Sequence, residues 1–310
     1  MSTLKAEETV GEVIIDINNV TKIYPGGVIG IKELTLQIKK NEIYGFLGQN
    51  GAGKTTTIRS ILNILIPEKG AIHVDKELIS RNNPSIREKI GYLPGELHVP
   101  TNYTVENFLH YMASLKKKQS DRLYEIANRF ELPLDKKVNT LSKGNKQKMG
   151  IVLAFMHDPE IYILDEPTSG LDPLWQQELY DLILEEKLKG KTIFFSSHNL
   201  DEVQKICDRV AIIREGKLVT VEIVNELAQK ITRFLTVTIE NLQEKELTDI
   251  QSNVQVDSYN ILSGEIKIKI SKPQDVSSTL GYFGKFNARM RDLVFPPASL
   301  ELFFMEKYRD

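Results

Sequence analysis

The feature that most constrains this chain is a glycine-rich run, Gly48-Gln49-Asn50-Gly51-Ala52-Gly53-Lys54-Thr55, which fits the pattern G-x-x-x-x-G-K-S/T. A strand-like apolar segment, Glu42–Leu47, comes before the run, and Thr55–Ile66 after it shows the apolar spacing of a helix. Glycines let a backbone curl so that several N–H groups face one phosphate, and the start of a helix adds its positive end. The run therefore predicts a nucleotide-binding turn between a strand and a helix, a common setting in α/β folds.

Within this turn, Lys54 is expected to reach the terminal phosphate oxygens, and Thr55 to hold Mg²⁺ through its hydroxyl. A second pair of candidates, Asp165 and Glu166, directly follows the apolar strand Ile161–Leu164. Ligands of α/β proteins bind beyond such strand ends. Asp165 is therefore the expected Mg²⁺ partner, and Glu166 the general base that polarises the attacking water. A charged strand end without function is the alternative, and the phosphate turn upstream argues against it.

Strands and helices alternate over residues 12–221, which predicts an α/β core with a parallel sheet. Leu34–Ile38 differs, because its apolar and polar residues alternate as in an antiparallel sheet. From residue 222 to 310 the order resembles a split βαβ unit, so a second, α+β domain is predicted there. Further expected strands are Val13–Ile17, Ala71–Val74, Ile90–Leu93, Thr192–Ser196, Arg209–Arg214, Phe234–Glu240, Val254–Tyr259, Glu265–Ile270 and Ala288–Phe295, and further helices are Thr104–Lys116, Asp121–Phe130, one from Ser142, Pro173–Lys187, Asp275–Phe283 and Ser299–Tyr308.

Bulk properties exclude several classes of protein. The net charge of −2 on 310 residues gives no long-range field toward nucleic acid or an anionic membrane. The single cysteine, Cys207, excludes an internal disulfide. No run approaches the roughly 18–20 apolar residues of a membrane helix, and residues 1–11 lack the apolar stretch of a signal peptide. We therefore expect any membrane role to come through a separate partner.

Four further segments resemble the motifs of ABC transporter nucleotide-binding domains. Leu141-Ser142-Lys143-Gly144-Asn145 resembles the LSGGQ signature, and Ser169-Gly170-Leu171-Asp172 the loop after the catalytic glutamate. His198 follows two serines at the end of a strand, as the family's switch histidine does, and Tyr24 resembles the aromatic residue that stacks on adenine. On these motifs, residues 12–221 are identified as similar to that family: a P-loop core with an antiparallel β subdomain and a helical subdomain.

The resemblance implies ATP and Mg²⁺ as cofactors, hydrolysis of ATP, and two copies that face each other head to tail. Each ATP then lies between the phosphate turn of one copy and the signature helix of the other, where Ser142 and the backbone at Gly144 contact the γ-phosphate. The candidate catalytic residues are Glu166 and His198, the metal residues are Thr55 and Asp165, and the nucleotide-binding residues are Tyr24, Gly48, Asn50, Gly51, Gly53, Lys54, Thr55, Thr56, Ser142, Gly144 and Asp172.

Several of these residues also have a purely structural interpretation. Ser142 is a good helix N-cap, and Asp172 stands before Pro173 as an N-cap residue would. Asn199 and Glu202 have the spacing of a capping box, which would explain the surroundings of His198 by structure alone. The two interpretations remain open at the level of the sequence.

Two departures from the family pattern matter for the chemistry. The signature has Lys143 and Asn145 where the family has glycine and glutamine, yet Ser142 is retained. The family also has a Mg²⁺-sensing glutamine after the strand Ile90–Leu93, where this chain has Gly95 and then Glu96. Two outcomes are open: Glu96 reaches inward instead, or the sensing contact is absent and hydrolysis is slower.

The resemblance also implies partners. Related proteins dock a membrane subunit on a helical insertion, which lies here at about 97–157 and includes Phe108, Leu109, Tyr111 and Met112. We expect an exporter ATPase that works as a homodimer with a separate integral-membrane permease, at the cytoplasmic face of the cell membrane and without nucleic acid. A soluble ABC ATPase for protein-complex assembly is the alternative. The domain at 222–310 is expected to help hold two copies together.

Overall fold

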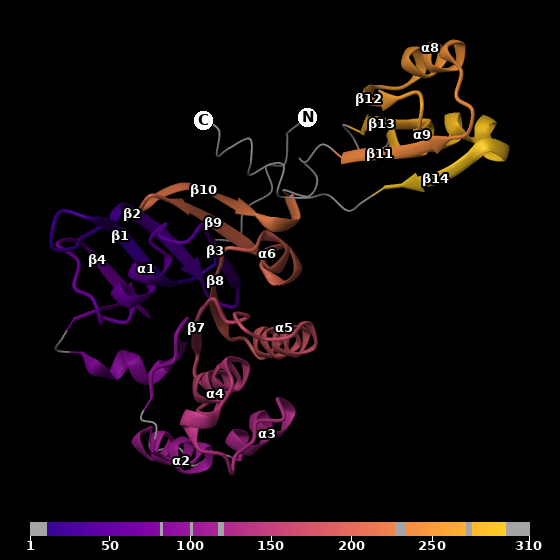
Figure 1. Ribbon diagram of the computed structural model, residues 1–310. Coiled ribbons are helices and arrows are strands. Elements are labelled where there is room, and N and C mark those ends of the chain that lie inside the picture. Colours follow the sequence, from indigo (N-terminus) through magenta and orange to yellow (C-terminus); the bar gives the residue numbers. More distant parts are fainter. Residues whose placement is uncertain are drawn as a thin grey trace, which may run out of the picture. The chain divides into compact units, whose positions relative to one another are not determined.

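The chain forms two compact units, Met1–Glu222 and Ile223–Asp310 (Figure 1). Each unit has a hydrophobic core built from its own residues, the usual property of a domain. The structure, a computed structural model, describes residues 11–80, 83–99, 102–116, 121–226, 233–270 and 275–295. None of the helices in these described ranges is both long enough and apolar enough to cross a membrane.

An antiparallel sheet in the first unit joins four strands in the order β2-β1-β4-β5. The strands β1 (Val13–Ile23) and β2 (Ile29–Lys39) are both longer than the predicted segments. Along β2, Leu36 is buried between exposed Thr35 and Gln37, so the predicted alternation is confirmed. The sheet is completed by β4 (Lys69–Val74) and β5 (Glu77–Leu78).

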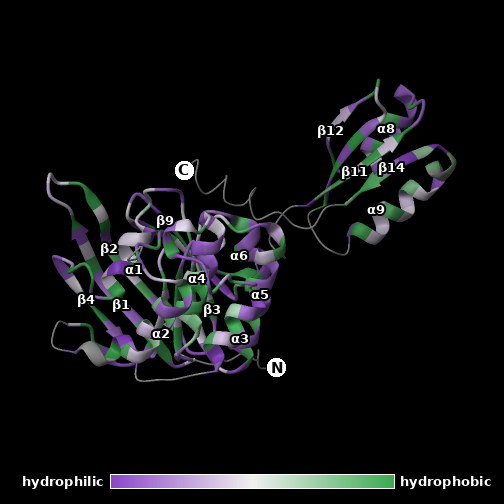
Figure 2. Ribbon diagram, turned by 60° about the horizontal axis from the view of Figure 1, so that its bottom comes forward, coloured by the Kyte–Doolittle hydropathy of each residue, from purple (hydrophilic) through white to green (hydrophobic). Residues whose placement is uncertain are grey.

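A six-stranded sheet in the order β10-β9-β3-β8-β7-β6 forms the centre of the first unit. The pairs β3–β8, β3–β9, β6–β7 and β7–β8 are parallel, and every residue of β3, β7 and β8 is buried. Figure 2 shows hydrophobic residues concentrated in this region. The predicted α/β fold class is therefore confirmed. The strands are β3 (Ile43–Leu47), β6 (Ile90–Leu93), β7 (Ile161–Asp165), β8 (Thr192–Ser197), β9 (Arg209–Arg214) and β10 (Lys217–Ile223).

The helices of the first unit mostly follow the predicted segments. The short segments η1 (Pro84–Lys89) and η2 (Val138–Thr140) were not predicted, and α1 (Lys54–Ile61), which was predicted to continue to Ile66, ends five residues earlier. Asn63, just beyond the cap, has a left-handed φ of 53°, which a continuing helix does not allow. The other helical segments are α2 (Val105–Leu115), α3 (Arg122–Arg129), α4 (Lys143–Phe155), α5 (Pro173–Leu188) and α6 (Leu200–Ile206).

The second unit has the order β-α-β-β-α-β, in which an antiparallel sheet runs β12-β13-β11-β14. This is the ferredoxin-like arrangement of a split βαβ unit. The helix α8 (Glu244–Asn253) was not predicted, and the expected helix Ser299–Tyr308 lies outside the described residues. The remaining elements are β11 (Arg233–Ile239), β12 (Val256–Asn260), β13 (Glu265–Ile270), α9 (Asp275–Phe283), η3 (Gly284–Arg289) and β14 (Met290–Val294).

Candidate active site

The glycine-rich run forms a tight turn between β3 and α1, as its sequence predicts. Gly53 has a φ of 108°, and a Cβ there would lie 2.5 Å from the carbonyl oxygen of Gly30, so only glycine fits. The side chain of Lys54 is buried, and its Nζ donates to the carbonyl oxygens of Gly48 (2.7 Å) and Gln49 (3.2 Å). The turn is thus wrapped around its own lysine, with the N-terminus of α1 behind it.

A hollow of about 300 Å³ opens above this turn. Eight of the predicted site residues are among those that line it. The hollow is lined by Tyr24, Val28, Ile29, Gly30, Asn50, Gly51, Gly53, Lys54, Thr55, Thr56 and Glu166.

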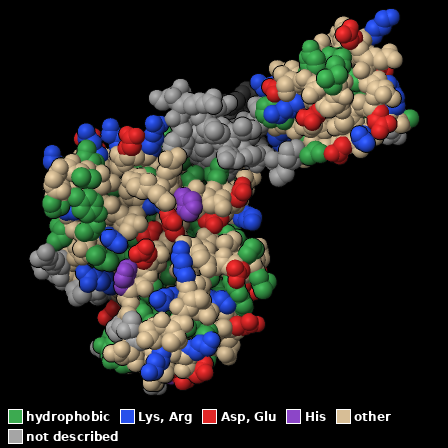
Figure 3. Space-filling view, viewed as in Figure 1, with side chains coloured by type: hydrophobic (Ala, Val, Ile, Leu, Met, Phe, Trp, Pro, Cys, Tyr) green, Lys and Arg blue, Asp and Glu red, His purple; other side chains and the backbone are tan. Residues whose placement is uncertain are grey.

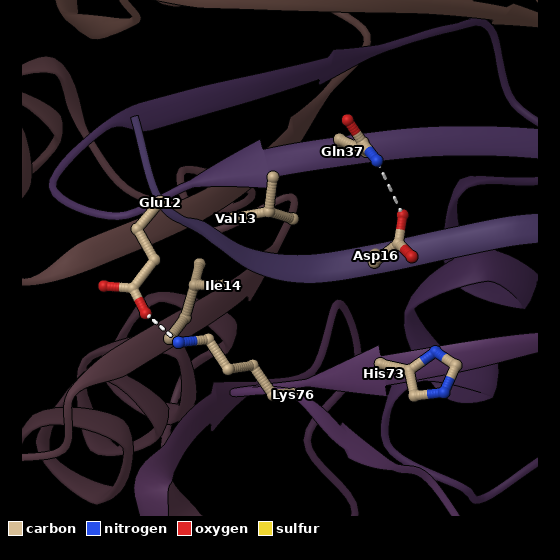
Figure 4. Close-up of a pocket in the computed structure, with 7 residues that line it drawn as sticks. All are labelled: Glu12, Val13, Ile14, Asp16, Gln37, His73 and Lys76. Carbon is tan, nitrogen blue, oxygen red and sulfur yellow. Dashed lines mark hydrogen bonds and ion pairs between the residues drawn. The ribbon is translucent and has the colours of Figure 1, made fainter. Parts of the chain in front are cut away.

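A second hollow, of about 410 Å³, lies on the sheet formed by β1, β2 and β4 (Figure 4). Glu12 and Lys76 form an ion pair there, and Gln37 donates to Asp16. None of the predicted site residues lines this hollow. The predicted chemistry therefore belongs to the hollow above the phosphate turn.

Asp165 is the last residue of β7, and its buried carboxylate is fixed at both oxygens. Its Oδ2 accepts from the Thr55 hydroxyl at 2.9 Å, and its Oδ1 accepts from the Ser196 hydroxyl at 2.7 Å. A hydroxyl and a carboxylate that converge in this way present the oxygen ligands that Mg²⁺ prefers. The two predicted metal residues, Thr55 and Asp165, thus lie in contact and fit that ion.

Glu166 lies between the two nitrogen-bearing side chains that the sequence placed in the site. Its Oε1 is 3.1 Å from the Nζ of Lys54, and its Oε2 is 3.2 Å from the Nδ1 of His198. The backbone of Glu166 has a left-handed φ of 45°, which turns the chain sharply as it leaves β7. Residues from three separate strand ends therefore meet at one carboxylate.

Tyr24 stands at the rim of the same hollow. Its hydroxyl hydrogen-bonds the hydroxyl of Thr56 at 3.0 Å, which holds the ring against the start of α1. Val28 and Ile29 line the hollow beside it and are largely exposed. These two apolar residues were not predicted as site residues, although their position after Gly26-Gly27 and near Tyr24 indicated a place at the site. Exposed apolar side chains beside an aromatic ring suit the face of a flat base.

Ser142, Gly144 and Asp172 do not line this hollow. Ser142 caps α4, and its Oγ accepts from the backbone N–H of Asn145 at 3.2 Å. Gly144 packs against the loop after Glu166, because a Cβ at this position would lie 2.9 Å from the carbonyl oxygen of Gly170. Asp172 precedes α5 without a side-chain capping bond, so the N-cap interpretation does not account for its carboxylate.

In the segment after β6, neither Gly95 nor Glu96 offers a side chain to the site. Gly95 lies next to Asp165, and a Cβ there would be 3.6 Å from the Oδ2 of that carboxylate. Glu96 does not reach inward: its side chain is 87% exposed and faces His98. Tyr92, the third residue of β6, lies in the same region, where burial and the nearby Asp165 charge raise the pKa of Tyr92 to about 12. The phenol therefore stays protonated at neutral pH.

A buried network that the sequence analysis missed holds the turn around His198. Glu202 accepts from the hydroxyls of Thr168 (2.8 Å) and Ser197 (2.6 Å). The capping box expected from Asn199 and Glu202 is wrong, because Glu202 points to these hydroxyls and the N–H of Asn199 donates to Ser197. Glu202 thereby links the loop after Glu166 to the turn that carries the histidine.

Comparison with known proteins places the chain in a family. The profile of the ABC transporter family matches residues 31–169. The bacitracin transport ATP-binding protein BcrA of Bacillus licheniformis is 35% identical over 280 residues, which cover 88% of each chain. The linearmycin resistance ATP-binding protein LnrL of Bacillus subtilis is 31% identical and covers 83% of this chain and 85% of its own.

A solved structure of the ATP-binding subunit of an ABC transporter superposes with a TM-score of 0.63 at 29% identity. It covers 69% of this chain and 91% of its own. The sequence relatives thus cover more than four fifths of this chain, and the solved structure shares its fold over 69% of it. This chain belongs to the ABC transporter family, as an ATP-binding subunit of the kind that hydrolyses ATP.

Proposed function

We propose that two copies of this chain clasp ATP between them and drive the export of a substrate through a separate membrane permease. One observation carries the proposal: the chain brings together only half of the predicted site. Lys54, Glu166 and His198 meet at the hollow, whereas Ser142 and Gly144 lie outside it at the start of α4. A second copy, placed head to tail, supplies the missing helix N-terminus.

In this proposal each site residue of one copy has a separate role in ATP hydrolysis. Lys54 and the turn bind the β- and γ-phosphates, and Thr55 and Asp165 would hold Mg²⁺, which would supply positive charge beside the phosphate oxygens. Glu166 takes a proton from the attacking water. The water oxygen bonds to the γ-phosphorus while the bond between that phosphorus and the β-phosphate oxygen breaks. His198, 3.2 Å from Glu166, orients this carboxylate. Because Lys54 contacts Glu166, phosphate binding competes for the lysine and frees the carboxylate.

The helical insertion supplies a surface for a membrane subunit. Of the residues predicted there, Phe108 and Leu109 are buried in the first unit, whereas Tyr111 is more than half exposed. Tyr103 and Leu115 are exposed as well. Exposed apolar side chains on and just before α2 are the surface that we propose for the contact with a membrane subunit. The names of the relatives, one for bacitracin transport and one for linearmycin resistance, favour an exporter.

The head-to-tail arrangement has a direct test by mixing two inactive variants. In a mixture of Lys54→Ala and Ser142→Ala, one of the two sites of a mixed dimer has an intact turn and an intact trans serine. ATPase activity is therefore expected to recover. The matched control mixes Lys54→Ala with Glu166→Gln, where each site lacks one residue of its own half, so no recovery is expected. Failure of the first mixture to exceed the control would contradict the trans role of Ser142.

The permease has its own test. Purification of the tagged chain from detergent-solubilised membranes is expected to bring down a multi-span protein. Tyr111→Glu, a change on the exposed face of α2, is expected to lose that protein while ATP binding is kept. Recovery of water-soluble partners alone would favour the assembly ATPase.

A further inference from the structure

Ser196, near the end of β8, makes two hydrogen bonds that both lead to the acid pair. Its hydroxyl donates to the Oδ1 of Asp165 at 2.7 Å, and the same oxygen accepts the backbone N–H of Glu166 at 3.0 Å. The side chain is fully buried, so water does not compete for either bond. One hydroxyl therefore contacts the predicted metal residue and the predicted base.

The position of Ser196 follows from the register of the sheet. β7 and β8 are parallel neighbours, and Asp165 pairs with Ser196. The N–H of Glu166 lies 3.2 Å from the carbonyl oxygen of Ser196, so backbone and side chain of one residue share this donor. The left-handed backbone of Glu166 is rare for a residue with a side chain and persists only where its surroundings hold it. The Ser196 hydroxyl is one of the groups that do so.

We propose that Ser196 is a positioning residue for ATP hydrolysis, an inference that rests on the function proposed above. The Ser196 hydroxyl donates to Oδ1 of Asp165. Oδ2 of the same carboxylate then faces Thr55, where the metal ion would bind. By accepting the N–H of Glu166, the hydroxyl fixes the turn that directs this carboxylate toward Lys54 and His198. Ser196 therefore acts through Asp165 and Glu166.

Ser196 could also have a purely stabilising role, which the positioning role has to be distinguished from. A buried serine needs hydrogen-bond partners in any fold, and its loss would lower stability wherever it stood. A positioning role predicts in addition a change in metal affinity, because groups that orient metal ligands typically contribute about 10- to 100-fold to metal binding or activity. The two interpretations differ in metal binding, which stability alone does not change.

The experiment compares Ser196→Ala with Ser196→Thr, which retains the hydroxyl, in the full chain. Mn²⁺ binding is measured by electron paramagnetic resonance with a non-hydrolysable ATP analogue, and ATP turnover as a function of Mg²⁺. Ser196→Ala is expected to weaken Mn²⁺ binding about tenfold and to slow turnover by about 10- to 100-fold. Nucleotide affinity in the presence of EDTA stays unchanged, and Ser196→Thr restores Mn²⁺ binding.

Ser60→Ala is the matched control, since Ser60 is also buried and its hydroxyl donates only to the carbonyl oxygen of Thr56 within α1. It removes a buried hydroxyl from the same unit and is expected to leave Mn²⁺ binding unchanged. If Ser196→Ala behaves like this control while Lys54→Ala and Asp165→Asn abolish turnover, the inference on Ser196 is overturned and the proposed site stands. If Lys54→Ala and Asp165→Asn keep turnover, the proposed site itself is wrong.

Discussion

The two units of this chain differ in whether they bury charged side chains. The first unit buries Lys54, Asp165, Glu186 and Glu202, each against partners of opposite charge or hydroxyl groups. Among the described residues of the second unit, the buried polar side chain is a threonine, Thr279, and the charged side chains lie at the surface (Figure 3).

This difference has an energetic meaning. Burial of a charge costs free energy that its partners offset only with good geometry. A domain that merely has to fold does better with apolar residues, as the core of the second unit does. Three of the buried charged residues named above, Lys54, Asp165 and Glu202, lie at the candidate site or support a loop beside it. Buried charge thus accompanies the candidate site, and variants of buried and exposed groups in both units test this difference.

The largest effect is expected at Glu166. Glu166→Gln keeps the shape of the side chain and removes its ability to accept a proton, so ATP turnover should fall by about 10²- to 10⁴-fold. Nucleotide binding stays intact. Phosphate release and nucleotide affinity are the two measurements, and Glu215→Gln, on a side chain that is 84% exposed, is the control with normal turnover. Equal turnover in Glu166→Gln would remove this residue from the role of base.

A large effect on stability is expected at Glu186, which is fully buried on α5. Its carboxylate contacts Arg122 (2.6 Å) and Lys189 (2.9 Å) and accepts from the Tyr162 hydroxyl at 2.7 Å. Burial raises the pKa of Glu186, but the hydrogen bonds from Lys189, Tyr162 and Arg122 outweigh it and hold that pKa below its ordinary value.

Glu186→Gln leaves Arg122 beside a neutral group, so the free energy of unfolding is expected to fall by about 3 kcal/mol or more. Chemical denaturation at neutral pH measures this loss. The carboxylate also ties Arg122 of α3 to Tyr162 of β7, three residues before Asp165, so ATP turnover at the growth temperature is expected to fall with stability. A loss below about 1 kcal/mol would show that this network does not stabilise the unit.

The sequence predicted the site residues that stand in recognisable motifs and missed the residues that only support them. Lys54 and Thr55 stand in one run whose residue types predict phosphate binding. Ser196 and Glu202 become visible only when β7 and β8 pair, because their partners lie 31 and 34 positions away in the chain. A serine on a strand gives no signal of the carboxylate that it contacts.

The fold shows the same limit. The fully apolar run of β7 identified a central strand, whereas α8 was missed because its buried apolar residues are only Leu247 and Ile250. Two apolar positions on a polar segment do not define a helical period. The early end of α1 was missed as well, since nothing in the sequence shows that Asn63 adopts a left-handed backbone.

A smaller effect is expected from the second unit as a whole. We predict that it helps to hold two copies together, and a chain ended after Val221 is expected to dimerise about tenfold more weakly with ATP, or about 1.4 kcal/mol. Tyr259 and Leu262, near the turn between β12 and β13, are 52% and 97% exposed and offer apolar surface to another copy. Sedimentation in a Glu166→Gln background, which preserves bound ATP, measures the dimer. Equal dimerisation of the shortened and whole chains would leave the second unit without this role.

The smallest effect is expected at Glu246, the surface counterpart of Glu186. Hydrogen bonds from Arg289 and from the backbone N–H of Gln243 lower the pKa of Glu246 below its ordinary value of 4.5. The stabilisation is thus complete above about pH 4.5 and disappears as pH falls through the lower pKa of the folded state. Because solvent screens such a pair, Glu246→Gln should shift the melting temperature at pH 7 by less than about 3 °C. If Glu246→Gln destabilised the chain as much as Glu186→Gln, the contrast between the units would fail. A surface pair would then stabilise the fold as strongly as a buried network.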